Sequence, residues 1–296
     1  MTAGSDQTWI AVDWGTSRLR TWAMAGDHVL RHATSDDGMA SLEPSGFEPA
    51  LLRLIHDWLP DGQTPVLACG MVGARQGWKE APYRGVPCAP VSAETLVHVT
   101  TTDPRIDVRI VGGLSQLCPP DVMRGEEVQI AGFLRHRPDF NGLIILPGTH
   151  SKHVWIKDHQ VQNFTTHMTG ELFAILGQHS ILRHSVGGDS VDQAAFAEGV
   201  RAGASGQELA QLFSIRAKGL VSEDTPDAAG SRLSGLLIGA ELAQVPQGTA
   251  IVLIGAGKLT DLYVQATEIL GQPAESLDGA DLVLAGLTHL HFMRQK

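Results

Sequence analysis

Residues 9–24 read WIAVDWGTSRLRTWAM, and this stretch decides the fold. An apolar run over residues 9–12 ends at a carboxylate, Asp13, and apolar and polar residues then alternate over residues 19–23. A period of two predicts two strands joined by a tight turn. A polar turn at residues 25–27 leads to a third expected strand at 28–34, so the first element is a β-meander with Asp13 at its first bend.

The turn after Asp13 has the composition of a phosphate-binding loop. Gly15 lets the backbone approach a ligand closely, and Thr16 and Ser17 add hydroxyls to the turn amides. We therefore expect Gly15, Thr16 and Ser17 to bind phosphate.

The same pattern returns in residues 144–161, which read IILPGTHSKHVWIKDHQV. Gly148-Thr149 corresponds to Gly15-Thr16, and a Trp follows each Gly at the same spacing. A duplicated unit predicts two similar lobes that share a site between their matching turns, where the two turns would clamp a polyphosphate. The alternative is that Gly-Thr occurs by chance in two unrelated hairpins.

Composition and charge exclude several classes of partner. The 296 residues carry a formal net charge of −10 without a run of Lys or Arg, which argues against nucleic acid and anionic membranes. The N-terminal residues lack the regions of a signal peptide, and no apolar run is long enough to span a membrane. We expect a cytoplasmic protein, and the sequence is compatible with a homodimer without deciding the oligomeric state.

The cysteines and histidines do not form a metal-binding pattern. Cys69, Cys88 and Cys118 are widely spaced and odd in number, as expected of reduced thiols. The close pairs His150/His153 and His289/His291 have no third or fourth ligand at suitable spacing, so surface or turn histidines are the better interpretation.

A helix and a long loop follow the first meander. Helical spacing over residues 49–59, followed by a short apolar strand at 65–70, indicates a crossover of the α/β kind. Residues 70–88 lack periodicity but are rich in Gly, Pro, aromatic residues and cations. Two interpretations stay open, a substrate-binding loop and an irregular surface connection whose aromatic residues seal the core.

Glu126 and Glu127 open a helix that extends to Leu134, with Gly132 allowing a close helix contact. Acids in a first helical turn often only complement the helix dipole. The functional alternative is that one of them is a general base with Arg124 beside it.

The C-terminal half contains further helical stretches and one expected loop. Thr169 has the character of an N-cap, and Glu171 falls in the first turn of its helix. The remaining expectations are helices at residues 192–204, 207–213 and 231–242, a loop at 217–230, and a final helix at 278–288 whose Gly286 mirrors Gly132. Gly235 and Gly239 permit a neighbouring helix to approach closely.

A third Gly-rich turn follows a buried strand at residues 250–254. Gly255 and Gly257, on either side of Ala256, leave room for a flat base at the carboxyl end of that strand. The dinucleotide fingerprint is incomplete, because a third Gly and a later acidic residue at the required spacings are both missing.

Several motifs, taken in order, resemble a known family. They are AVDWGTSRLR at 11–20, GMVG at 70–73, MRGEE at 123–127, LPGTHSK at 146–152, MTGEL at 168–172 and LSGLLIGAE at 233–241. Over nearly the whole chain they resemble the bacterial 2-dehydro-3-deoxygalactonokinases, within the actin and sugar-kinase superfamily. Two features depart from the wider superfamily. Leu146-Pro147 stands where an Asp often sits, and the connecting helix opens with Glu where sugar kinases typically use Asp.

The resemblance implies a fold and its division into lobes. The fold class is α/β, with two similar lobes of ribonuclease H-like mixed sheet and helices, the actin-like ATPase fold, around an interdomain cleft. Residues 1–135 would form the N-terminal lobe, completed by the C-terminal helix at 281–296. Residues 136–280 would form the C-terminal lobe with the second phosphate motif and the adenosine motif.

The resemblance also implies an activity, transfer of the γ-phosphoryl group of ATP to the 6-hydroxyl of 2-dehydro-3-deoxy-D-galactonate in galactonate catabolism. Asp13 would hold Mg²⁺ through water, and Glu126, in preference to Glu127, would be the base, with Arg124 orienting it or neutralising the γ-phosphate. The other implied residues fall into three sets. They are Gly15, Thr16, Ser17, Gly148, Thr149 and Lys152 for phosphates, Gly255, Ala256 and Gly257 for adenosine, and Met71, Gly73, Arg75, Trp78, Lys79 and Tyr83 for the sugar acid.

Two questions stay open at this stage. The cation that binds the substrate carboxylate is Arg75, Lys79 or Arg84. The alternatives to this function are a kinase of another sugar acid or a pantothenate-like metabolite, and an actin-like nucleotide-binding protein without catalytic activity.

Overall fold

The computed structural model describes residues 8–222 and 224–294, and the chain divides into two compact units. The described part of unit 1 falls within residues 1–140, 157–163 and 280–296, and unit 2 takes residues 141–156 and 164–279. We keep the lobe boundaries expected from the sequence, 1–135 with 281–296 and 136–280, as a proposal.

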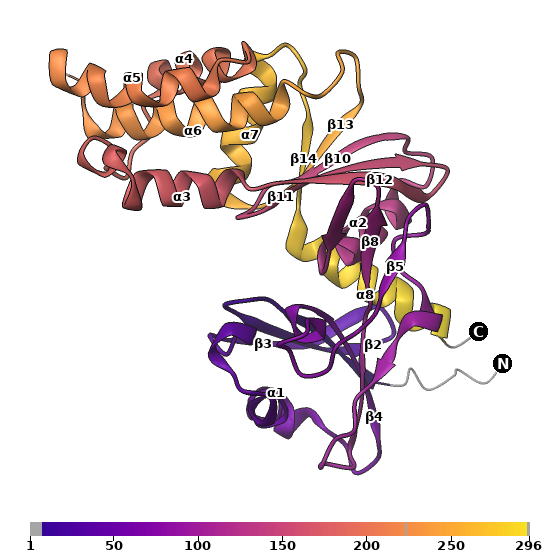
Figure 1. Ribbon diagram of the computed structural model, residues 1–296. Helices are drawn as coiled ribbons and strands as arrows, with labels where there is room; N and C mark the ends of the chain where they lie inside the picture. Colours follow the sequence, from indigo (N-terminus) through magenta and orange to yellow (C-terminus); the bar gives the residue numbers. More distant parts are fainter. Residues whose placement is uncertain (1–7, 223, 295–296) are drawn as a thin grey trace. The chain divides into compact units, whose positions relative to one another are not determined.

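Unit 1 contains a mixed sheet with the strand order β3-β2-β1-β4-β7-β6 (Figure 1). Its strands are β1 Thr8–Trp14, β2 Leu19–Ala25, β3 His28–Ser35, β4 Thr64–Gly70, β6 Val97–His98 and β7 Ile106–Ile110. The β-meander β1-β2-β3 is antiparallel, whereas β1, β4 and β7 run parallel. The expected meander and the strand after the first helix are therefore confirmed.

Unit 2 repeats this plan with the strand order β12-β11-β10-β13-β14. Its strands are β10 Gly142–Leu146, β11 Ser151–Lys157, β12 Gln160–His167, β13 Ile251–Gly255 and β14 Glu275–Asp278. As in unit 1, the first strand pairs antiparallel with the second and parallel with the fourth. Each sheet thus has a meander at one edge followed by parallel strands, and in unit 1 the short β6 adds an antiparallel strand at the far edge. This duplicated mixed sheet is the ribonuclease H-like arrangement of actin-like ATPases, which confirms the predicted fold class.

A small third sheet was not foreseen from the sequence. It has the order β5-β8-β9, with β5 Tyr83–Gly85, β8 Gly113–Leu117 and β9 Pro120–Met123. The long segment 70–88 therefore contributes a strand to this sheet, which leads through β9 to Arg124.

The helices of unit 1 are α1 Phe47–Ile55, α2 Glu126–His136 and α8 Gly279–Arg294. A Cβ atom on Gly132 of α2 would lie 2.0 Å from the Leu282 carbonyl oxygen, and one on Gly286 of α8 would lie 2.0 Å from the Val128 carbonyl oxygen. The two helices thus touch backbone to backbone through their glycines, which confirms the close contact expected at Gly132 and Gly286. The short 3-10 helices are η1 Met39–Ser41, η2 Pro44–Gly46, η3 His56–Trp58, η4 Met71–Gly73, η5 Ala93–Thr95 and, in unit 2, η6 Ile181–His184.

Unit 2 carries the helices α3 Thr169–His179, α4 Gln193–Ala204, α5 Glu208–Val221, α6 Pro226–Leu242 and α7 Gly257–Ile269. Helices α4 and α6 pack through glycines, since Cβ atoms on Gly235 and Gly239 would each lie 2.2 Å from a carbonyl oxygen of α4. This confirms the close approach expected at both positions.

Three local predictions in unit 2 were wrong. His153, expected at the surface or in a turn, lies within β11 and is buried. The expected loop at 217–230 is mostly helical, because α5 continues to Val221 and Thr225 caps α6, with Pro226 in its first turn. Thr169 is not an N-cap but the first residue of α3, since Met168 holds the cap position. The Thr169 hydroxyl is instead engaged in a buried network described below.

The six-stranded sheet of unit 1 buries apolar side chains on both faces. In unit 1 one cluster includes Val12, Trp14 and Phe47, and a second includes Trp9, Val128 and Leu287. Over residues 8–222 and 224–294, no helix is long and apolar enough to cross a membrane.

Candidate active site

Asp13 lies near the end of β1, directly opposite Arg20 on β2. Its side chain is buried, and Arg20 Nη2 forms an ion pair with Asp13 Oδ2. Burial raises the pKa of Asp13 above its ordinary value, although the charge and hydrogen bond of Arg20 act to lower it. Cys69 Sγ lies 4.0 Å from Asp13 Oδ1, and burial raises the pKa of this thiol, so it stays neutral.

The turn after β1 is held by the segment that contains η1. The N–H groups of Met39 and Ala40 donate to the carbonyl oxygens of Gly15 and Thr16, each at 3.0 Å. Among the described residues, the N–H groups of Thr16 and Ser17 donate to no protein acceptor, and both residues are exposed. The turn is therefore held by hydrogen bonds to its carbonyl groups, while the amides of Thr16 and Ser17 have no acceptor among the described residues and are available to an anion.

The two acids at the start of α2 have different surroundings. Glu126 is half-buried, and its Oε2 accepts a hydrogen bond from the Arg124 N–H at 3.0 Å. Glu127 is fully buried, and its Oε2 accepts from the Gly125 N–H at 2.6 Å, whereas its Oε1 has no hydrogen-bond partner among residues 8–222 and 224–294. Burial, with the neighbouring charge of Glu126, raises the pKa of Glu127 to about 8. Glu127 is therefore mostly protonated at neutral pH.

Arg124 is brought together with two of the predicted substrate residues. Its guanidinium stacks 4.4 Å from the centre of the Tyr83 ring, and its Nη2 donates to the Ala81 carbonyl oxygen at 2.7 Å. A Cβ atom on Gly73 would lie 2.8 Å from Arg124 Nη1, so the glycine makes room for the guanidinium. Arg124 Nε and Nη1 are buried and have no hydrogen-bond partner in the part of the chain that the structure describes, which leaves this cation short of acceptors.

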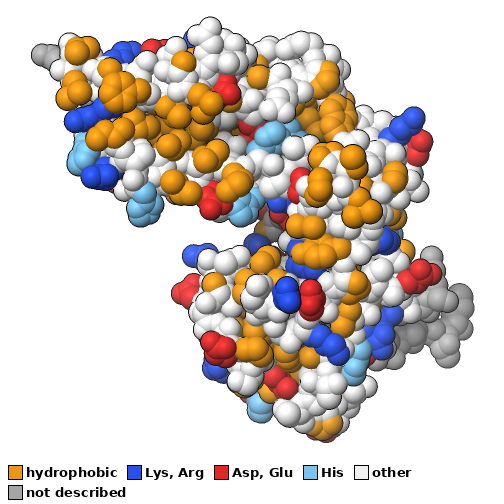
Figure 2. Space-filling model, in the orientation of Figure 1, with side chains coloured by type: hydrophobic (Ala, Val, Ile, Leu, Met, Phe, Trp, Pro, Cys, Tyr) orange, Lys and Arg blue, Asp and Glu red, His pale blue; other side chains and the backbone are white. Residues whose placement is uncertain are grey.

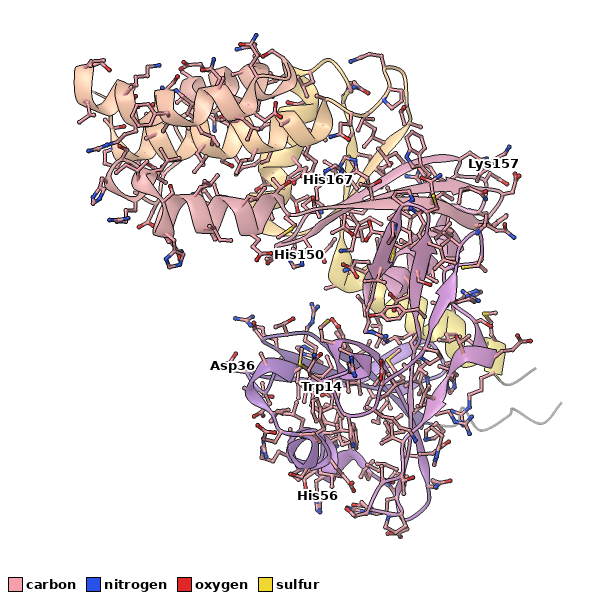
Figure 3. All side chains as sticks on the ribbon, viewed as in Figure 1. Trp14, Asp36, His56, His150, Lys157 and His167 are labelled. Atoms are coloured by element: carbon pink, nitrogen blue, oxygen red, sulfur yellow. The ribbon has the colours of Figure 1, made fainter. Side chains whose placement is uncertain are left out.

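The other predicted substrate residues are divided between core and surface. Trp78 packs against Trp14 and Phe47, with ring centres 6.1 and 6.2 Å apart, so the packing interpretation of the loop holds for this aromatic residue (Figure 3 labels Trp14). Met71 is half-buried in η4.

The three candidate cations of the loop also differ. Lys79 Nζ donates to the His98 carbonyl oxygen at 3.0 Å, and Arg84 Nη2 donates to the Ala89 carbonyl oxygen. Arg75 is exposed, and it forms no hydrogen bond or ion pair with any residue that the structure describes. Of the three, Arg75 has its charge most fully available to an anionic ligand.

The second turn, residues 147–150, packs on the start of α3. The Glu171 N–H donates to the Thr149 carbonyl oxygen at 3.0 Å, and a Cβ atom on Gly170 would lie 2.6 Å from the Gly148 carbonyl oxygen. His150 lies where β11 approaches α3, and its Nε2 is 2.5 Å from Glu171 Oε2 (Figure 3). Lys152 is buried within β11 at 6% exposure.

A buried carboxylate that the sequence did not single out lies behind this turn. Glu241 of α6 accepts hydrogen bonds from Ser151 Oγ at 2.7 Å, from His153 Nε2 at 2.8 Å and from Tyr263 Oη at 2.6 Å. Thr169 Oγ1 donates to the same carboxylate.

The third turn leads into α7 and borders a pocket. Ala256 is the N-cap residue of α7, and Gly257 has a φ of 68°, a backbone conformation that favours glycine. The pocket has a volume of about 550 Å³ and lies among α3, α6, α7 and residues 186–191. Its walls are mostly apolar with a few polar groups, including Phe173, Leu237 and Leu262 beside Ser234 and Asp227. Size and lining suit a flat heterocycle with polar substituents.

The model of the 2-keto-3-deoxy-galactonokinase family matches residues 13–290. The chain belongs to this family. A Rhizobium meliloti protein named as a probable 2-dehydro-3-deoxygalactonokinase is 40% identical over 291 residues, covering 94% of each chain. The 2-dehydro-3-deoxygalactonokinase of Escherichia coli is 35% identical over 287 residues, covering 94% of this chain and 96% of that one.

A crystal structure supports the same family assignment at the level of the fold. It is of a Sinorhizobium meliloti protein provisionally assigned as a 2-dehydro-3-deoxygalactonokinase. The two chains are 38% identical and superpose with a TM-score of 0.90, over 95% of this chain and 97% of the other. The resemblance inferred from the motifs is thereby confirmed.

In a kinase of this family, the residues around Asp13 fit Mg²⁺. In phosphoryl-transfer sites this ion is commonly bound by one or two carboxylates, several waters and the substrate phosphates, and Asp13 offers such a carboxylate beside a turn with free amides. The Arg20 side chain that pairs with Asp13 is 37% exposed, so it can move aside. The structure's described residues include no group of three or more His, Cys, Asp or Glu that could hold a metal without substrate.

Two features of the site were missed at the sequence level for different reasons. The pairing of Arg20 with Asp13 follows from the register of a tight hairpin and could have been found by writing out that register. The Glu241 network joins positions up to 112 residues apart in the chain, and only the folded unit brings them together.

Proposed function

We propose that the protein is an ATP-dependent sugar-acid kinase that phosphorylates the 6-hydroxyl of 2-dehydro-3-deoxy-D-galactonate. The observation that carries this proposal is the family match over residues 13–290, together with curated relatives of the same name over 94% of the chain. Family membership favours this substrate over a pantothenate-like metabolite, and it favours a kinase over a nucleotide-binding protein without catalytic activity.

The two Gly-Thr turns are proposed to bind the phosphates of ATP. In each turn the carbonyl groups are held by neighbouring segments, at Gly15 and Thr16 by residues 39–40 and at Thr149 by α3. Amides fixed in this way can donate to phosphate oxygens without first being ordered, which is the preorganisation that phosphoryl transfer needs. Ser17, Gly148 and Lys152 complete the proposed phosphate-binding set.

Asp13 is proposed to hold Mg²⁺ through water. When bound, the ion would neutralise charge on the transferring phosphoryl group. The ion pair with Arg20 opposes the effect of burial on Asp13, because desolvation raises the pKa of the carboxyl group whereas the charge and hydrogen bond of Arg20 act to lower it.

Glu126 is proposed as the base that takes the proton from the attacking hydroxyl. It is half-buried and retains contact with solvent, whereas Glu127 is fully buried with a pKa raised to about 8. The Arg124 N–H on Glu126 Oε2 fixes the direction of that carboxylate. Arg124 therefore orients the base through its backbone, while its guanidinium is held by Ala81 and Tyr83.

The adenosine is proposed to bind at the turn Gly255-Ala256-Gly257 and in the neighbouring pocket of unit 2. The pocket's apolar walls would contact the base, and Gly257 begins α7 at the pocket's edge, where Lys258 and Leu259 line it. On the visible face of unit 2, hydrophobic side chains gather over α5 and α6 and toward α3 (Figure 2), and Phe173 of α3 is 37% exposed.

The sugar acid is proposed to bind at the loop that contains Met71, Gly73, Arg75, Trp78, Lys79 and Tyr83. Arg75 is the best candidate for its carboxylate, since Lys79 and Arg84 donate to backbone carbonyls. An unpaired guanidinium on the surface can form two parallel hydrogen bonds with a carboxylate.

A coupled ADP-release assay with a panel of sugar acids and pantothenate tests the function. We expect ADP release that depends on 2-dehydro-3-deoxy-D-galactonate, with kcat/KM for this compound at least about tenfold above every other member of the panel. ³¹P NMR of the product should show a 6-phosphate monoester. A clear preference for another acceptor would move the assignment to that acceptor, and ADP release independent of any acceptor would refute the kinase function.

A further inference from the structure

Glu241 is the centre of a closed polar network within unit 2. Its two carboxylate oxygens accept hydrogen bonds from four side chains, those of Ser151, His153, Thr169 and Tyr263. All five residues are buried, with exposures between 0% and 8%. The carboxylate therefore cannot touch a substrate, and any effect on activity has to pass through its four partners.

Glu241 stays ionised in this setting. Burial acts to raise its pKa, but the hydrogen bonds from His153, Thr169 and Tyr263 and the charge of His153 outweigh burial, and the net pKa is lowered. Hydrogen bonds to a charged acceptor are stronger than those between neutral groups, so the network holds its members more firmly than neutral contacts would.

The partners of Glu241 lie next to the elements proposed to bind the nucleotide. Ser151 directly follows the second turn, and His153 lies two residues further along β11. Thr169 begins α3, whose Glu171 N–H binds the Thr149 carbonyl oxygen. Tyr263 belongs to α7, the helix that starts at the third turn.

We propose that Glu241 is a positioning residue that fixes the second phosphate turn relative to α7. When the base of a nucleotide is bound at α7, its phosphates then reach the amides of that turn. This inference rests on the proposed function, because it presupposes that the second and third turns bind phosphate and adenosine. The residue acts through Ser151, Thr169 and Tyr263.

The proposal differs from a purely structural role in what it predicts for two ligands. Adenosine would contact only the base-binding side, whereas ADP must also reach the second turn. Loosening the turn relative to α7 therefore weakens ADP binding and leaves adenosine binding unchanged. A network that only stabilises unit 2 would affect both ligands alike.

The test measures ADP and adenosine affinity by calorimetry in the wild type and in Glu241→Gln, together with kcat and both KM values. Gln preserves the shape of the side chain but removes its charge. We expect ADP affinity and the KM for ATP to worsen roughly tenfold, with adenosine affinity and the KM for the sugar acid unchanged within about twofold. Circular dichroism and thermal unfolding verify that the variant is folded.

Two further variants complete the design. Glu198→Gln, on α4, removes an equal charge from a carboxylate that is 52% exposed and pairs with Lys218 and Arg232, and it should leave ADP affinity unchanged. Tyr263→Phe removes one hydroxyl from the network at nearly constant volume, at a buried residue that does not line the pocket. If Glu241→Gln fails to fold, Tyr263→Phe should still weaken ADP binding several-fold without weakening adenosine binding.

The outcomes separate this inference from the proposed function. A wild type that binds neither ADP nor ATP would refute both. Normal wild-type binding with equal losses of ADP and adenosine affinity in Glu241→Gln, or with no loss of either, would refute the positioning role alone.

Discussion

Each unit has a buried carboxylate at its meander, Asp13 in unit 1 and Glu241 in unit 2. The two carboxylates are held by different kinds of partner. Asp13 in unit 1 belongs to the hairpin itself, pairs with Arg20, and has a pKa raised by burial. Glu241 in unit 2 comes from α6, accepts four hydrogen bonds, and has a lowered pKa. At the end of β10, the strand equivalent to β1, the hairpin has Leu146 opposite Lys152 where unit 1 has Asp13 opposite Arg20.

The difference shows that burial alone does not distinguish a carboxylate that can bind a ligand from one with a structural role. Asp13 has a single charged partner on a partly exposed side chain, so its hydrogen-bonding capacity is incompletely used and can be turned to a ligand. Glu241 is saturated by protein donors and has no capacity left. We infer that Asp13 takes part in phosphoryl transfer by holding Mg²⁺ and that Glu241 positions the second turn relative to α7.

The largest expected effect is at Asp13. Asp13→Asn should abolish turnover, a loss of roughly 10³-fold or more, because it removes the charge proposed to organise Mg²⁺. The fold should survive, since the amide is isosteric and Arg20 can turn to solvent. Steady-state kinetics with a thermal unfolding scan measure both. Activity near that of the wild type would show that Asp13 is as structural as Glu241.

The pair Glu126 and Glu127 repeats the comparison on adjacent residues. Glu126→Gln should lower kcat by roughly 10² to 10⁴, the usual scale for loss of a general base, with little change in ATP affinity. Glu127→Gln is the matched control and should cost much less, because its buried side chain is already mostly protonated at neutral pH. A larger loss at Glu127 would reverse the assignment, and small losses at both would mean that the reaction needs no dedicated base.

Glu127 itself should give the protein a distinctive dependence of stability on pH. Its folded pKa of about 8 lies above the ordinary value of 4.5, so between these pH values the folded state binds its proton more tightly than the unfolded state does. The free energy of unfolding should therefore fall as pH rises through this range, by at most about 1.4 kcal/mol per pH unit from this group.

Urea denaturation at pH values from 5 to 8 measures this slope. Glu127→Gln, which imitates the protonated acid, should reduce the slope relative to the wild type and gain relative stability toward pH 8. Parallel curves for the two proteins would mean that Glu127 titrates near its ordinary pKa and is less desolvated than its burial implies.

The smallest expected effect concerns an exposed charge. Arg75→Ala should raise the KM for the sugar acid about tenfold, the scale of one charge-assisted hydrogen bond, and leave the KM for ATP unchanged. Lys79→Ala tests the second cation of the same proposed binding loop and should raise this KM less, because that side chain already donates to a backbone carbonyl. A stronger effect at Lys79 would move the carboxylate contact to that residue.

Local pattern predicted much of this protein, and the reason is physical. The period-two alternation around Asp13 and Gly148 predicts each hairpin and its register. A shift of one residue would move every side chain of the strand to the opposite face of the sheet. Gly132 and Gly286 predicted a close helix contact, because a side chain at either position would collide with the backbone of the neighbouring helix.

Tertiary features were out of reach of the sequence pattern. A lone Glu241 in a helix of small residues gives no local sign that it will be buried among four donors. The difference between Glu126 and Glu127 depends on which neighbours cover each side chain, and the sequence offers only their order. The expected loop at 217–230 failed because polar residues there cap and begin α6, which composition cannot distinguish from a loop.

The division of labour between the two carboxylates is tested most directly by the Mg²⁺ dependence of ADP affinity, measured by calorimetry in the wild type, Asp13→Asn and Glu241→Gln. We predict that Mg²⁺ tightens ADP binding in the wild type and that Asp13→Asn loses this Mg²⁺ dependence. Glu241→Gln should bind ADP more weakly both with and without Mg²⁺ but should keep the Mg²⁺ dependence. Retention of the Mg²⁺ effect in Asp13→Asn, or its loss in Glu241→Gln, would contradict the account.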